Sequence, residues 1–186
     1  MKQKEVIPAG SGWINKTPLD FSGSPFRRIG SDWMLITAGD VSADKGNWNT
    51  MTASWGGLGV LWAKNVAFIF IRPSRRTFEF ADKSSLVTLS FFDESKRGAL
   101  NLCGKVSGRD TDKATAAGLT QIVFSDELSA GAIGFMEAKE TMICKRIYFH
   151  DIDKNKFLDS SVEHNYNGKD YHRMYVVEIL GLKTKI

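Results

Sequence analysis

Three arginines, a serine and a threonine lie within residues 72–77 (RPSRRT), between an apolar run and a segment with helical character. The first turn of a helix offers free N–H groups and a favourable dipole to an anion, and arginine adds a planar fork of donors that matches a phosphate. Solvated surface arginines are the alternative. Anion binding is favoured, because cations at a helix N-terminus are unfavourable unless an anion accompanies them.

A second group of small polar residues lies in residues 49–55 (NTMTASW), where β-branched and aromatic side chains alternate with hydroxyls and an amide. Such a strand edge lets a planar ligand approach the backbone, and its hydroxyls and amides can donate to ring oxygens and nitrogens. An ordinary Thr- and Ser-rich strand with a buried tryptophan explains the pattern equally well. From the residues alone both interpretations stay open.

A third group, residues 107–113 (SGRDTDK), has the composition of a turn followed by a capped helix. Arg109 and Lys113 would add positive charge to a phosphate site. The competing interpretation, slightly favoured here, has Asp110 as a helix cap and Lys113 in water.

Several other chemistries find no support. The chain contains no GxxxxGK[ST], no HExxH and no GxSxG, and its three histidines (His150, His164 and His172) do not have the spacing of a metal module. Residues 151–162 begin like a calcium-binding loop but carry Lys156 in place of the required glycine and Val162 in place of the bidentate carboxylate. No metal site is therefore expected.

Composition describes an ordinary globular chain of 186 residues with 42% apolar and 25% charged residues. The net charge of +4 is spread without long basic runs, so nucleic acid is not indicated, whereas a phosphorylated cofactor or a dinucleotide would suit it. No signal peptide and no bilayer-spanning run is recognised, and the two cysteines form no CxxC. We expect a cytoplasmic protein without a membrane partner.

The elements that would position these residues are mostly strands. Residues 1–32 predict an extended arm, rich in Gly, Ser and Pro and anchored by Trp13, Phe21 and Phe26; a domain of residues 33–186 follows. Strands are predicted over 33–38, 48–55, 65–71, 85–92, 120–124, 139–151 and 171–182, with a glycine turn at 56–59 and a polar stretch over 42–47. Short helices are predicted over 74–80, 96–102 (closed by Gly104) and 111–117. The last two strands are expected to be antiparallel, with the turn around 165–169. Strands that do not alternate with long helices favour a mainly β fold, and closure into a barrel would remove exposed edges.

Three stretches together resemble the FMN-binding split-barrel family of flavin reductases, and most closely its flavoredoxin-type branch: residues 49–80, 100–120 and 167–179. The resemblance implies a six-stranded antiparallel Greek-key split β-barrel with a few short helices, a homodimer, and FMN as cofactor. It places the isoalloxazine and ribityl chain against Asn49, Thr50, Met51, Thr52, Ala53, Ser54 and Trp55. It places the phosphate against Arg72, Ser74, Arg75 and Thr77, with Arg109 and Lys113 closing over the cofactor. Relatives often carry an aromatic residue where this chain has Arg76, and another where it has Ala114.

The activity implied by the resemblance is an NAD(P)H-dependent flavin reductase, with NADH or NADPH as electron donor. A flavoredoxin-like electron carrier with tightly bound FMN and a separate redox protein partner is the alternative, and a flavin-binding module without turnover is a third. FMN would supply the redox chemistry, so no side-chain acid or base is strictly required. His172 is the one histidine placed where a catalytic role is conceivable, although a strand histidine is more often structural.

Overall fold

The structure is a computed structural model, and it describes residues 5–7, 12–39 and 47–186. Most of the predicted polar stretch at 42–47 and part of the predicted arm lie outside the described residues. The strands are β1 (Glu5–Ile7), β2 (Trp13–Lys16), β3 (Met34–Gly39), β4 (Trp48–Ala53), β5 (Gly56–Leu61), β6 (Lys64–Ile71), β7 (Leu86–Phe91), β8 (Gln121–Phe124), β9 (Ile133–Phe135), β10 (Glu140–Asp151) and β11 (Arg173–Lys185). The α-helices are α1 (Pro25–Gly30), α2 (Arg76–Ala81), α3 (Arg97–Lys105) and α4 (Lys113–Ala116); 3₁₀ turns are η1 (Pro18–Asp20), η2 (Glu94–Lys96), η3 (Lys154–Lys156) and η4 (Ser160–Asn165).

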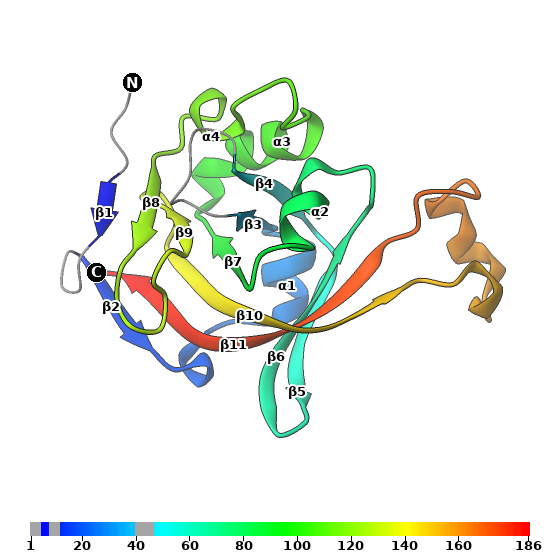
Figure 1. Cartoon of the computed structure of the whole chain (residues 1–186), viewed down its shortest axis with the longest axis horizontal. Coiled ribbons are helices and arrows are strands. Elements are labelled where there is room, and N and C mark those ends of the chain that lie inside the picture. Colours follow the sequence, from blue (N-terminus) through cyan, green and yellow to red (C-terminus); the bar gives the residue numbers. More distant parts are fainter. Residues whose placement is uncertain (1–4, 8–11, 40–46) are drawn as a thin grey trace.

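The main sheet has eight strands in the order β4-β3-β7-β10-β11-β6-β5, with β2 added to β11 (Figure 1). Every pairing in this sheet is antiparallel. The strands β7, β10 and β11 are neighbours in the sheet, and β6, which precedes β7 in the chain, pairs with the other edge of β11. This arrangement is a Greek key. A separate small sheet joins β8 to β9 and, in parallel, to β1. The predicted mainly β, Greek-key fold is confirmed, whereas the predicted count of six strands is too low.

Two hydrophobic cores lie on opposite faces of the main sheet. The first collects one face of β3, β4, β6, β7, β10 and β11, including Ile36, Ile69 and Leu89, with Leu58 of β5 packed against it. The second lies on the other face of β3 and β10, at Leu35 and Ile143, and is covered by α3, α4 and the small sheet. Strand β3 is consequently buried on both faces, which accounts for its almost continuous run of apolar residues.

Three sequence predictions about the elements are wrong. Residues 56–59 form the first part of β5 instead of a turn, and the chain reverses at Trp62 and Ala63, whose φ angles are +52° and +56°. Two successive positive φ angles match the twist of a tight hairpin. Helix α3 continues through Gly104 and ends at Lys105. The third error concerns Phe26, which is 90% exposed and therefore anchors nothing.

The predicted N-terminal arm and the connection between β10 and β11 contain more regular structure than predicted. Trp13 is buried and Phe21 packs against the first core, as expected of anchors, but β2 pairs with β11 and α1 lies near β5. The strands β10 and β11 pair as predicted. Their connection, residues 152–172, contains η3 and η4 and projects from the body of the molecule (Figure 1).

Candidate functional site

The site consists of two adjoining cavities that share two lining residues. The first, of about 170 Å³, is here called the aromatic cavity; it is lined by Met51, Thr52, Ala53, Ser54, Trp55, Phe70, Arg72, Arg75 and His172. The second, of about 390 Å³, is called the cationic cavity; it is lined by Arg72, Ser74, Arg75, Arg76, Lys105, Val106, Ser107, Gly108, Lys113 and Asp170. Arg72 and Arg75 border both, so the two cavities form one elongated site with different chemistry at its ends.

Strand geometry builds the aromatic cavity. The end of β4 and the link to β5 supply residues 51–55, β6 supplies Phe70, and His172 directly precedes β11. The ring of Trp55, 44% exposed, lies 5.1 Å from the ring of His172. The hydroxyl of Thr52 in this cavity donates its hydrogen to the carbonyl oxygen of Leu100 in α3, so it is not free to donate to a ligand. The exposed indole of Trp55 thus offers an apolar surface in this cavity.

His172 is buried and held by an aromatic neighbour that sequence reasoning missed. Its Nδ1 lies 3.1 Å from the hydroxyl of Tyr166, and the Tyr166 ring stacks on Tyr171 at 4.8 Å. Burial, assisted by the positive charge of Arg72, lowers the pKa of His172 to about 4. The imidazole is therefore neutral at physiological pH and offers a hydrogen-bonding group without a charge.

The C-terminal end of α3 positions two cations of the cationic cavity. Arg75 donates to the carbonyl oxygen of Gly104 at 3.0 Å, and the Lys113 Nζ donates to the carbonyl oxygen of Cys103 at 2.9 Å. The last carbonyls of a helix lack partners within the helix and carry partial negative charge, so they attract such donors. Burial above all, together with the charge of Arg75, lowers the pKa of Lys113 to about 8.

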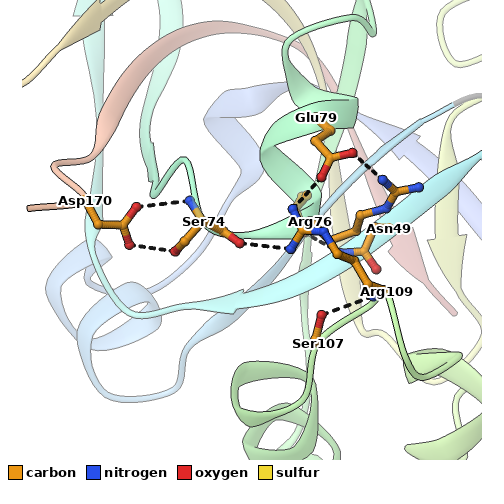
Figure 2. A network of polar contacts seen from close by, with 8 residues as sticks. Asn49, Ser74, Arg76, Glu79, Ser107, Arg109 and Asp170 are labelled. Atoms are coloured by element: carbon orange, nitrogen blue, oxygen red, sulfur yellow. Dashed lines mark hydrogen bonds and ion pairs between the residues drawn. The ribbon is translucent and has the colours of Figure 1, made fainter.

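Five basic side chains and one carboxylate line the cationic cavity. The carboxylate is that of Asp170, which accepts from the backbone N–H of Ser74 at 3.0 Å and from its hydroxyl at 2.6 Å (Figure 2). Basic residues in excess, with a hydroxyl and a backbone N–H among them, are the donors that a phosphate group requires. Sequence reasoning gave no signal for Asp170, which lies 96 positions from Ser74 in the chain.

The cavities contain most of the predicted binding residues but not all of them. Four predicted residues, Asn49, Thr50, Thr77 and Arg109, line neither cavity. Thr50 is buried against Thr37, and Asn49 donates to the hydroxyl of Thr77 at 2.8 Å. The side chain of Asn49 also fills the space that a side chain at Gly108, in the wall of the cationic cavity, would need: an added Cβ there would lie 2.0 Å from its Oδ1.

Arg109 lies at the edge of the site, where a carboxylate already engages it. Glu79 forms ion pairs with Arg76 and Arg109, and Arg109 also donates to the carbonyl oxygen of Ser74 at 3.1 Å (Figure 2). Although burial opposes the shift, the hydrogen bond from Arg109 and the charge of Arg76 lower the pKa of Glu79. The helix α2 that begins at Arg76 is only six residues long. Because so short a helix has a weak dipole, the positive charge of the cationic cavity comes mainly from the arginine and lysine side chains.

Two absences concern only the part of the chain that the structure describes. Within it, no group of three or more His, Cys, Asp or Glu side chains is arranged to hold a metal ion. Among the same residues, no helix has both the length and the apolar character needed to cross a membrane.

The fold has known counterparts. No family model matches the sequence, and no curated protein matches it significantly. Similar solved structures include the FMN-binding domain of a flavin reductases-like enzyme from Shewanella baltica, with a TM-score of 0.63, 12% identity, and coverage of 93% of this chain and 77% of that chain. Flavoredoxin of Desulfovibrio vulgaris has a TM-score of 0.61 and 18% identity, with coverage of 89% and 77%. An FMN-binding protein from Thermus thermophilus with bound 1-cyclohex-2-enone has a TM-score of 0.58 and 15% identity, with coverage of 87% and 77%. The chain thus has the split-barrel fold of flavin reductase-like proteins.

Proposed function

We propose that this protein binds FMN and acts as an NAD(P)H-dependent flavin oxidoreductase. The observation that carries the proposal is the elongated site itself, in which an aromatic cavity and a cationic cavity meet at Arg72 and Arg75. FMN has the same polarity, with a planar ring at one end and a phosphate at the other. The similar structures named for FMN binding, flavin reductase and flavoredoxin add support from the fold.

The residues present fit this cofactor in two ways. The positive excess of the cationic cavity suits a phosphate dianion, and Ser74 already holds an oxyanion there, in the form of the Asp170 carboxylate. Residues 51–55, Phe70 and His172 would surround the ring. Bound FMN would supply the hydride and one-electron chemistry. The protein would bind the phosphate, orient the ring and keep an uncharged imidazole beside it.

The test is a comparison of FMN with riboflavin, which lacks the phosphate. We expect the purified protein to bind FMN, and the bound flavin to bleach when NADH or NADPH is added without oxygen. Arg75→Gln removes a charged donor from the cationic cavity, and a hydrogen bond of this kind is worth about 1.5–3 kcal/mol. The variant should therefore bind FMN roughly tenfold to a hundredfold more weakly, and the loss for riboflavin should be much smaller, because riboflavin meets Arg75 only where it borders the aromatic cavity.

Arg27→Gln is the matched control, because the side chain of Arg27 is 79% exposed in α1. A chain that binds neither flavin contradicts the proposal. Equal weakening of FMN and riboflavin by Arg75→Gln contradicts the phosphate assignment. Rapid bleaching with exchange of free flavin supports the reductase, retained flavin that passes electrons to a separate redox protein supports the carrier, and resistance to both nicotinamides leaves a flavin-binding module.

We also infer a homodimer. Strand β5 is an edge strand of the main sheet. It and the turn that follows it carry exposed apolar side chains: Val60 is 72% exposed and Trp62 is 59% exposed. Trp62 lies edge-on to Tyr148 of β10, itself 44% exposed. An edge with contiguous apolar side chains is a surface that proteins usually cover. Light scattering after size exclusion should give twice the chain mass, and Trp62→Glu should give the single mass.

The proposed location is the cytoplasm. Both cysteines, Cys103 and Cys144, are buried and free, and burial raises the pKa of both thiols, which keeps them protonated and unreactive. Reduced thiols suit a reducing compartment. Fractionation of cells that express the chain, with thiol titration of the isolated protein, tests the assignment.

A further inference from the structure

The carboxylate of Asp170 occupies donors that would otherwise be free to bind a ligand. Both of its oxygens are bound by Ser74 (Figure 2). The nearer nitrogen of Arg72 lies 4.0 Å from Oδ2. Asp170 adopts a φ of +58°, a conformation that L-residues other than Asn and Asp rarely take. The backbone is thus shaped to bring an acidic side chain to this point in a cavity whose other charged side chains are all basic.

The segment that carries Asp170 also reaches the aromatic cavity. Arg72 donates to the carbonyl oxygen of Asn165 at 2.7 Å, and its guanidinium lies 5.1 Å from the ring centre of Tyr166. Tyr166 in turn holds His172. One short segment, residues 165–172, therefore touches the cationic cavity through Asp170 and the aromatic cavity through His172.

We propose that Asp170 is a built-in competitor for the phosphate of the ligand: a phosphate that binds Ser74 and Arg72 displaces the carboxylate, and residues 165–172 then repack against the aromatic cavity. Two anions cannot share the same donors, because like charges a few ångströms apart repel. Asp170 thereby sets the phosphate affinity of the site and reports its occupancy to His172. The inference rests on the proposed function in assigning that phosphate to FMN, whereas the displacement itself concerns any phosphate.

The decisive variant is Asp170→Asn. Asparagine tolerates a positive φ as aspartate does, and its carbonyl oxygen can still accept from Ser74, so mainly the charge is lost. We expect inorganic phosphate and FMN to bind about fivefold more tightly to the variant, and riboflavin to bind within about twofold of the wild type; a like-charge repulsion of about 1 kcal/mol gives this factor. Glu127→Gln is the control, since it removes one exposed negative charge from the β8–β9 loop and should change nothing.

A second readout needs no flavin. The ring proton resonances of His172 are followed by NMR while inorganic phosphate is added, with His150 and His164 as internal references. In the wild type the His172 resonance should move as phosphate binds. In Asp170→Asn without phosphate, it should lie close to the wild-type position, because the amide oxygen still accepts from Ser74, and it should reach the phosphate-bound position at a lower phosphate concentration. If that variant does not fold, Ser74→Ala serves, because loss of the hydroxyl weakens the hold on Asp170 and should move the same resonance in the free protein.

The outcomes separate the two proposals. Phosphate affinity that is unchanged or weaker in Asp170→Asn overturns the competitor role, as does a His172 resonance that phosphate does not move. If FMN still binds in that case, the proposed function survives. If FMN fails to bind while the phosphate titration behaves as expected, the anion site stands and the flavin assignment falls.

Discussion

Lys113 offers the sharpest test of the electrostatics, because it is a buried ammonium group at the wall of the cationic cavity. Moving its pKa from 10.5 to about 8 corresponds to roughly 3 kcal/mol of destabilisation of the folded state at neutral pH. Below pH 8 the folded and unfolded chains both hold the proton, and this cost is constant. Between pH 8 and 10.5 the unfolded chain holds a proton that the folded chain has lost, so the free energy of unfolding rises with pH.

Lys113→Met removes the charge and keeps a side chain of similar length. At pH 7 the variant gains roughly 3 kcal/mol by losing the buried charge and loses about 1–2 kcal/mol because the carbonyl oxygen of Cys103 is left without its donor. We therefore expect the variant to be more stable than the wild type by roughly 1–2 kcal/mol at pH 7, and less stable by a similar amount at pH 10.5. Its FMN affinity should fall if Lys113 binds the FMN phosphate, as we propose.

The assay is urea unfolding at half-unit steps from pH 6 to 10.5. Only the difference between variant and wild type is interpreted, because tyrosines and other lysines also titrate in this range. Lys105→Met is the control, since Lys105 lines the same cavity but is exposed. The reasoning is refuted if Lys113→Met is the less stable protein at pH 7, or if its difference from the wild type does not change with pH.

Three further results are expected. The ring resonances of His172 should titrate with a midpoint of about 4 and stay flat from pH 5.5 to 8; a midpoint near 6.5 would show that burial does not control the group. Thr50→Val should cost about 1–3 kcal/mol in thermal unfolding, because the buried hydroxyl of Thr37 loses its partner at 2.9 Å, and an unchanged midpoint would rule that out. Gly108→Ala should weaken FMN binding at least fivefold at a stability cost of about 1–3 kcal/mol, because its Cβ would collide with Asn49; normal binding would show that this loop does not shape the site.

The hydrophobic periodicity of the sequence was sufficient to predict most strands of the sheet, but not to predict that the glycines at 56–59 lie in a strand. Alternating and continuous apolar runs correctly predicted β6, β7, β10 and β11, because burial on one or both faces imposes those periods. Residues 56–59 were predicted to turn since glycine is common in turns. In the structure the ring of Phe68 on β6 covers two of these glycines, at 3.7 Å from the Cβ position of Gly57 and 3.8 Å from that of Gly59. That cross-strand contact is invisible to a local reading.

For the site as well, local sequence indicated some of the residues, whereas contacts between residues far apart in the chain could not be predicted. Residues 51–55 with Arg72, Ser74, Arg75 and Lys113 line the cavities, where the resemblance to flavin reductases placed them; their types alone left residues 51–55 open and slightly favoured a solvated Lys113. Arg109 lines neither cavity, and its guanidinium is bound by Glu79, thirty positions away, a contact that the local sequence does not indicate. Tyr166 and Asp170 could not be foreseen, since they depend on how the connection between β10 and β11 folds back over Arg72.

The pairing of β2 with β11 has a consequence for the order in which the molecule forms. Asn15 and Lys183, which meet in this pair, are 168 positions apart, so β2 leaves the ribosome long before its partner exists. Contacts of such separation close late, because a long loop must lose its entropy first. We therefore expect β2 to be among the last strands to pair, and Trp13, buried there, would report that step by fluorescence in a variant whose other four tryptophans are replaced.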